Sequence, residues 1–388
     1  MGSLGIGKMT GKRHHYVPQF LQQGFNSRIG RETPRTWLYR KGAAAPVEAT
    51  LRHVGVEVSF YRYKALGVDI SADEAITRAE GQRLAPLVRR LRAENPVSER
   101  DAAALAELFA HIYARTKAVW EIGKMQTPRM FERLSAFVRD PQAIQSVLPR
   151  LLETQRPIFM QLLPARYPDC DIGKVLAEYV EQLGAASPAE PCSSDVIRML
   201  DDLLELAFRA LQVSKVKSMQ ELSERPEVAR RFQGCTFSIL EWYGAHLVQG
   251  DTPVVFYRVG GFTPILAKDE SFDYAVLPLT PTRVVVASTS GDMPNSWETL
   301  RDASIACSYQ HFIGAACYPE LETLSATLGS EFPAVTDADI ERLFTEAVEL
   351  ASTPGWMGPE VRAFLERLVQ KYLWAPQDGG VAAPGALE

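Results

Sequence analysis

The sequence predicts an α+β fold with a central, mainly antiparallel sheet and a large helical insertion packed against it. Residues 36–63 and 235–290 alternate between apolar and polar side chains and are rich in β-branched and aromatic residues, which is typical of strands. Between these regions, at about residues 71–230, the apolar period is helical. Neither β region has enough strands to bury an apolar face well alone, so we expect both to share one sheet.

The N-terminal region, residues 14–65, has the pattern of loops and strands. Its strand candidates are Thr36–Tyr39 and Val56–Tyr63. The helical block starts at Ser71, and Pro86 is expected to kink or bound its first helix because proline lacks a backbone N–H.

A second helix is expected from Ser98, an N-cap candidate with Asp101 three residues on, to Val119. Helical patterns then continue to about residue 230. The RRLR stretch at residues 89–92 is interpreted as a solvated helix face, with a phosphate-binding patch as the less favoured alternative.

The second β region contains four strand candidates, followed by helices at about residues 300–313 and two more within 337–373. The strands are expected at residues 235–242, 254–259, 273–279 and 283–288. We expect one α+β domain over residues 12–330, C-terminal helices at 331–375 and a disordered tail at 376–388. A separate helical domain is the alternative.

Composition narrows the class of protein. The chain has 388 residues, 46% of them hydrophobic, which suffices for a large core. A net charge of -5 provides no global basic field, so there is no strong nucleic-acid signature and the partners remain unknown. No apolar run predicts a membrane span or a secretion signal, and we expect a cytoplasmic protein. Five widely spaced cysteines without a CxxC motif suggest reduced, buried thiols and argue against structural zinc.

Adjacent histidines near the N-terminus are the first candidates for chemistry. His14 and His15 can act as a general base, a proton donor or a metal ligand near neutral pH. Neighbouring residues of a strand point to opposite faces, so both could bind one ion only in an irregular loop. The alternative is that one histidine hydrogen-bonds the backbone while the other is exposed, and on the residues alone it is favoured about two to one.

A second polar cluster lies between two strands, at residues 249–254. Asp251, followed by Thr252 and Pro253, suits a tight turn in which the carboxylate caps backbone N–H groups. Alternatively, Asp251 at a strand end holds a metal, orients a histidine or acts as a base.

Two charged side chains occupy apolar helix faces. Glu80 lies one turn from Ile76 and from Leu84, and Arg115 follows Ile112 on its stripe. Burying either charge alone would cost several kcal/mol, so they either pair with each other or belong to a polar site. No GxGxxG, GxxxxGK[ST], HExxH or GxSxG motif is present.

A family resemblance is carried by five segments in this order: KRHHYVPQFLQQGF, SFYRY, IYARTK, QGDTPVVF and AVLPLTPTRVVVAS. Over about residues 12–315 they resemble the uncharacterised bacterial family "domain of unknown function 4238". The family's His-Tyr-Val-Pro-Gln-Phe motif matches His15–Phe20, and its Arg-Thr pair matches Arg115 and Thr116. Its Ser-Asp-Asn-Pro-Val motif corresponds to residues 250–254, where this chain has Gly and Thr at the first and third positions. The resemblance implies no reaction.

Two functions are compatible with these residues. The first is a hydrolase of phosphodiesterase or nuclease type in which His14 or His15, Arg115 and Asp251 supply a base, an anion-stabilising cation and a carboxylate. Mg²⁺ is the candidate metal, although no motif indicates one. The supporting residues would be Tyr16, Tyr61, Glu80, Thr116, Thr252 and Pro253.

The second function is a non-catalytic binding or sensor protein, such as one in a defence or toxin system, in which the same residues form a structural polar network. The lack of a catalytic motif favours it. The two functions differ in whether these side chains converge on an open cleft or are buried and mutually hydrogen-bonded.

Overall fold

The computed structural model describes residues 13–28, 33–65, 68–93, 97–140, 226–266 and 270–351, with six single positions between 156 and 177. The chain divides into two compact units, one of residues 1–125 and 212–334, the other of residues 126–211 and 335–388. Most helices expected between residues 141 and 225, the second C-terminal helix and the tail lie outside the described residues. The predicted division at residues 12–330, 331–375 and 376–388 stays a prediction.

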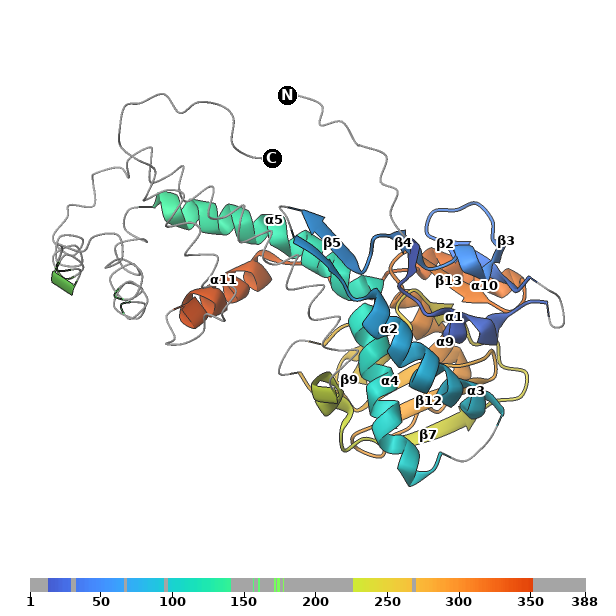
Figure 1. Ribbon diagram of the computed structural model, residues 1–388. Helices are drawn as coiled ribbons and strands as arrows, with labels where there is room; N and C mark the ends of the chain where they lie inside the picture. The colour runs from blue at the N-terminus through green and yellow to red at the C-terminus, as the bar shows by residue number, and fades with distance from the viewer. Residues whose placement is uncertain are drawn as a thin grey trace. The chain divides into compact units, whose positions relative to one another are not determined.

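The first unit contains a five-stranded antiparallel sheet in the order β10-β9-β11-β12-β7 (Figure 1). Its strands reproduce the expected second β region closely, because each alternates apolar side chains between two covered faces. They are β7 Thr236–Glu241, β9 Val255–Arg258, β10 Gly261–Thr263, β11 Tyr274–Pro278 and β12 Arg283–Ser288.

Both faces of this sheet are buried. Phe256, Leu277 and Val285 share one core with α3 (Ala85–Ala93) and α4 (Ala102–Arg115). The alternate side chains form a second core with α9 (Trp297–Ala306), and Figure 1 shows α3 and α4 in front of the strands. Each fully buried aliphatic side chain contributes about 1.5 to 3 kcal/mol. This layering confirms the α+β class.

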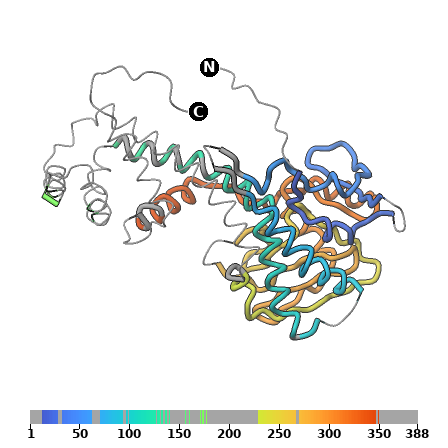
Figure 2. The backbone as a smooth tube through the Cα atoms, in the orientation of Figure 1, coloured from blue at the N-terminus to red at the C-terminus, as the bar shows by residue number. Residues whose placement is uncertain are grey.

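A second, four-stranded sheet has the order β3-β2-β13-β8, and it differs from the predicted arrangement. Its strands are β2 Arg35–Arg40, β3 Val47–Thr50, β8 Gln249–Gly250 and β13 His311–Gly314. The N-terminal strands therefore pair with β13, and of the second β region only β8 joins their sheet. Figure 2 shows this pairing as blue N-terminal tube beside orange tube.

Strand β13 corrects the helix expected at residues 300–313. The helix α9 ends at Ala306. The N–H groups of Tyr309, Gln310 and His311 donate to the carboxylate of Asp251, so they are not available to the carbonyls of a continuing helix.

Two short ribbons complete the described strands: β1 Arg13–His15 pairs with β4 Val56–Val58, and β5 Arg62–Ala65 pairs with β6 Val68–Ser71. The single strand expected over Val56–Tyr63 is interrupted by a turn. Ser59 has a φ of 57°, in the left-handed region, and this turn brings the N–H of Tyr61 to His14.

The helix expected from Ser71 changes type along its length. It is α-helical at α2 (Asp73–Ala79), π-helical at Glu80–Leu84 and α-helical again at α3. The π turn ends two residues before Pro86, whose ring would clash with the carbonyl of residue 82 in a regular α-helix. This agrees with the expected disturbance at Pro86.

The expectation that RRLR at residues 89–92 forms a solvated helix face is wrong for two of its three arginines. Arg90 pairs with Asp101, and Arg92 donates to the carbonyls of Leu21 (2.7 Å) and Leu279 (3.0 Å). Arg89 is exposed. Two of the three guanidinium groups therefore bind protein groups.

The helix expected from Ser98 begins with the 3₁₀ turn Glu99–Asp101, and α4 follows at Ala102. The N–H and hydroxyl of Ser98 donate to the Asp101 carboxylate at 2.9 and 2.8 Å. The helix ends earlier than predicted. Thr116 is extended (φ -61°, ψ 142°) and separates α4 from α5 (Lys117–Arg139). The hydroxyl of Thr116 donates to the carbonyl of Tyr113 (3.0 Å), so the Arg-Thr pair marks a helix break.

The remaining described elements are short helices and α11. The short helices are α1 Gln19–Gln22, α10 Pro319–Leu324 and the 3₁₀ turns Gln23–Phe25, Leu51–His53, Glu99–Asp101, Pro226–Phe232 and Ser325–Thr327. In the second unit, α11 (Asp337–Ala351) packs Phe344 against Phe137 of α5. No helix in the described ranges is both long and apolar enough to span a membrane. Cys235 and Cys307 are buried free thiols, whereas Cys317 is exposed, contrary to expectation.

Candidate functional site

His14 is buried and accepts a hydrogen bond from the main chain. The N–H of Tyr61 donates to its Nδ1 at 3.0 Å, so neutral His14 carries its proton on Nε2. That Nε2 lies 3.0 Å from a carboxylate oxygen of Asp73, and the imidazole stacks on the Tyr61 ring at 5.3 Å. These contacts hold the imidazole in one orientation.

His15 points to the other face of β1. Its Nδ1 donates to the carbonyl of Val54 (3.2 Å), and its Nε2 accepts from the side-chain amide of Gln19 (2.9 Å). Burial is the main cause that lowers the pKa of His15. Both histidines therefore bind the backbone.

Arg115 is the centre of a buried polar network and is 3% exposed. Its Nε donates to the Tyr61 hydroxyl (2.6 Å), and its Nη2 donates to the carbonyl of His15 (2.5 Å). Its Nη1 forms an ion pair with Glu80 and donates to Nε2 of His111 (2.9 Å). Because arginine can only donate, His111 must accept and is neutral, and burial lowers its pKa to about 4. The alternative in which Glu80 and Arg115 pair is confirmed.

Local structure explains why these charges meet. Glu80 is the first residue of the π turn, and Arg115 is the last residue of α4 before the break at Thr116. A π turn rotates the side chains that follow it relative to an α-helix. Both irregularities in the helices therefore coincide with members of the network.

Asp251 is fully buried, and its carboxylate accepts three main-chain N–H groups. Oδ1 accepts from Tyr309 (2.7 Å), and Oδ2 accepts from Gln310 (2.7 Å) and His311 (3.2 Å). The N–H of Asp251 donates to the carbonyl of His311 (3.0 Å). Asp251 thus caps backbone N–H groups as the simpler interpretation expected, but on a distant segment of the chain. These N–H groups take three of the roughly four acceptor positions of the carboxylate, and the described residues hold no group of three or more His, Cys, Asp or Glu that could hold a metal ion.

The turn around Asp251 is closely packed. A Cβ at position 250 would lie 2.0 Å from the hydroxyl oxygen of Ser308, so Gly250 is required for this approach. Thr252 and Pro253 are buried on the other side of Asp251. The glycine that departs from the family motif is therefore matched to its surroundings.

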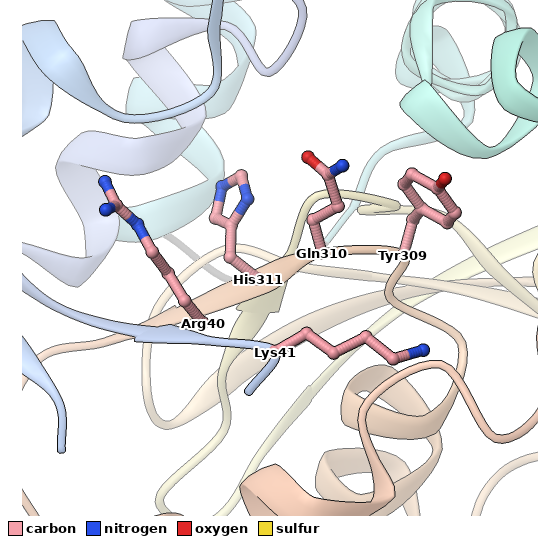
Figure 3. A pocket seen from close by; sticks show the side chains of 5 residues that line it. All are labelled: Arg40, Lys41, Tyr309, Gln310 and His311. Atoms are coloured by element: carbon pink, nitrogen blue, oxygen red, sulfur yellow. The ribbon is translucent and has the colours of Figure 1, made fainter. Parts of the chain in front are cut away.

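His311 connects this turn to an open pocket. Its Nδ1 lies 3.4 Å from Oδ2 of Asp251, and its side chain is 12% exposed. The register of β13 on β2 places His311 opposite Arg40, so both side chains share one face of the four-stranded sheet. With Lys41, Tyr309 and Gln310 they line a cavity of about 520 Å³. Figure 3 shows Arg40, His311, Gln310 and Tyr309 extending to the same side.

Several charges act on the His311 imidazole. Burial is the main cause that lowers its pKa, the Arg40 and Lys117 cations lower it further, and the Asp251 carboxylate raises it. His311 is therefore neutral at pH 7 and able to accept a proton.

The cations near the pocket differ in their partners. Lys117 lies 3.4 Å from a Glu57 carboxylate, and Lys124 lies 2.9 Å from that of Glu121. Arg40 and Lys41 have no ion-pair partner in the part of the chain that the structure describes. Their charge is available to an anion.

The predicted site residues form two groups. His14, His15, Tyr61, Glu80 and Arg115 belong to the buried network, while Asp251 belongs to the pocket. Tyr16 is the connection, because its ring lies 6.2 Å from that of His311 in an edge-on orientation.

Reasoning from sequence missed His311, Arg40, Lys41, Gln310 and Tyr309. The helix expected over residues 300–313 hid the strand that carries His311. The available signal was HFIG after SYQ, in which aromatic and β-branched residues follow a polar break.

A family model described as "Protein of unknown function (DUF4238)" matches residues 13–304, more than half of the chain. The chain belongs to this family. No curated protein and no solved structure matches the chain. The match to DUF4238 includes Arg40, Arg115 and Asp251 and ends before His311. The family resemblance of the motifs is thus confirmed, and it assigns no reaction.

Proposed function

We propose that the protein hydrolyses a phosphate ester, as a phosphodiesterase does, in the pocket of Arg40 and His311. One observation carries this proposal: a neutral imidazole next to a buried carboxylate faces a pocket lined by two cations, Arg40 and Lys41, that have no ion-pair partner among the described residues. A base and cations at one pocket are the groups that metal-independent phosphoester hydrolysis needs.

Each residue has a role in this reaction. His311 removes a proton from water while the water oxygen bonds to phosphorus, and the bond from phosphorus to the leaving oxygen breaks. Because attack at phosphorus is in line, the leaving oxygen departs on the far side and takes its proton from solvent, and the imidazolium returns its own proton to solvent. Asp251 orients the imidazole and stabilises its charged form, as the 3.4 Å separation allows. Arg40 and Lys41 bind the phosphoryl oxygens.

The proposal keeps Asp251 from the sequence prediction and changes its partners. The polar atoms of His15 and Arg115 already bond protein groups, and His14 accepts from a buried N–H. Their catalytic role is therefore not part of the proposal.

The test uses bis(4-nitrophenyl) phosphate as a diester and 4-nitrophenyl phosphate as a monoester, with and without Mg²⁺. His311→Gln should lower kcat by about 100-fold or more, because it removes the base. Arg40→Ala should raise KM for the anionic substrate. His53→Gln is the matched control, because His53 is exposed and does not line the pocket. Equal rates for His311→Gln and His53→Gln would overturn the proposal.

A non-catalytic anion-binding or sensor protein is the second candidate, and the same pocket would serve a sensor of a defence or toxin system. It is favoured by the occupation of both Asp251 oxygens by main-chain N–H groups, which is a structural arrangement. Phosphate or RNA binding that depends on Arg40, without turnover of either ester, would select this candidate.

A further inference from the structure

We infer that Tyr16 is a positioning residue for His311, and that Arg115 holds Tyr16 in place through the main chain of His15. The role of His311 as base rests on the proposed function, whereas the positioning does not. The inference joins three separate sequence motifs into one path of contacts, from Glu80 to the pocket.

Tyr16 is enclosed on several sides. Tyr16 is only 5% exposed, and the centroid of its ring lies 5.7 Å from that of Phe60 and 6.2 Å from that of His311. The Lys117 ammonium lies 5.3 Å from the ring centroid. The N–H of Tyr16 donates to the carbonyl of Gly55 (2.9 Å). A ring held in this way restricts the volume open to the imidazole.

The residue before Tyr16 is held by two donors. The carbonyl of His15 accepts from the Tyr61 hydroxyl (2.7 Å) and from Nη2 of Arg115 (2.5 Å). The same guanidinium also donates to Tyr61 and His111 and pairs with Glu80, so its plane is fixed by four different groups. A lysine ammonium cannot reproduce this planar set of donors.

His311 reports on the position of Tyr16. The charged and titratable groups that face it are Asp251 beside β8, Arg40 at the end of β2, Lys117 of α5 and Tyr16 itself. Because burial is the main influence on the imidazole, loosening the Tyr16 ring admits water and moves the pKa of His311 up toward 6.5.

The experiment is an NMR titration of the histidine imidazole signals in the full chain, with the His311 signal assigned from His311→Gln. Tyr16→Leu, which keeps an apolar side chain, should raise the pKa of His311 by about half a unit or more. Arg115→Lys should shift it in the same direction. Tyr61→Phe, which removes one donor to the His15 carbonyl, provides a milder variant if Arg115→Lys does not fold.

Arg92→Lys is the matched control. Arg92 also donates to two main-chain carbonyls, those of Leu21 and Leu279, but it lies outside the path to Tyr16. It should leave the pKa of His311 unchanged even where it lowers the melting temperature.

An unchanged His311 pKa in Tyr16→Leu, or equal shifts in Tyr61→Phe and Arg92→Lys, would overturn the positioning role. This outcome is distinguishable from failure of the proposed function, since the titration needs no substrate. If these variants shift the pKa of His311 but the protein hydrolyses neither ester, Tyr16 is still a positioning residue and only the proposed reaction is rejected.

Discussion

Two regions of the first unit combine a carboxylate, a histidine and an arginine, with opposite results. In the buried network, Glu80 pairs with Arg115, and Arg115 donates to His111. Each group has a partner within the set, and only Glu80 is appreciably exposed, at 21% of its side chain. The set is closed.

In the pocket, the carboxylate of Asp251 is instead occupied by three main-chain N–H groups. Arg40 is consequently left without an ion-pair partner among the described residues, and His311 faces the cavity. The comparison shows that the partner of the carboxylate decides whether the arginine and histidine beside it are structural or can bind a ligand. Where main-chain N–H groups stabilise the carboxylate by hydrogen bonds, the arginine is left to bind a ligand.

The largest expected effect on stability comes from a substitution in the buried network. Arg115→Met should destabilise the protein by roughly 3 to 5 kcal/mol, because it leaves Glu80 ionised without its partner. Urea unfolding measures this free energy. Arg92→Met is the control, since within the ranges that the structure describes Arg92 binds two carbonyls and no carboxylate. A loss no larger than that of the control would mean that the Glu80 pair contributes little.

The second effect tests the hydrogen bonds from the backbone to Asp251. Asp251→Asn should destabilise by about 2 to 3 kcal/mol, because an amide NH₂ group would face buried N–H donors that need an acceptor. Thermal unfolding measures the change, with Asp292→Asn at an exposed position as the control. Unchanged stability would show that the three N–H bonds are not required.

Acid should lower the stability of the protein through His111 of the buried network. The pKa of His111 is about 4 in the folded protein, below its usual value of 6.5, so the unfolded state binds the proton first as the pH falls. The stability present above pH 6.5 should therefore decline toward pH 4, by about 2 kcal/mol at pH 5 from this residue. Urea titrations of wild type and His111→Gln between pH 7 and 5 test this, and parallel curves would contradict it.

The smallest effect on stability is expected at the pocket. Arg40→Met should change the unfolding free energy by no more than about 0.5 kcal/mol, because Arg40 is exposed and forms no ion pair within the described part of the chain. The same variant should weaken inorganic phosphate binding by about tenfold, measured by calorimetry. Stability loss with intact phosphate binding would place Arg40 with the structural residues.

Several features were predictable from local pattern. The strands β7, β9, β11 and β12 follow from alternation, and the 3₁₀ turn that leads into α4 follows from Ser98 and Asp101. The pairing of Glu80 with Arg115 follows from the high free energy of an unpaired charge on an apolar helix face.

Other features depended on distant partners. The strand β13 was expected to be helix, because the Asp251 carboxylate that accepts the N–H groups of His311 and of the two residues before it lies far away in the sequence. The break at Thr116 and the turn at Ser59 were missed for the same reason, since Arg115 and Tyr61 find their partners across the fold.

By itself the sequence determined the family, the α+β class and the identity of the charged residues that need partners, because composition, periodicity and desolvation act locally. Only the tertiary structure decided which partners they have. The pairing of β2 with β13 places Arg40 beside His311, and the main-chain N–H groups of Tyr309 and Gln310 occupy Asp251. Strand register and backbone direction are set by the packing of the whole unit, and they separate the open pocket from the closed network.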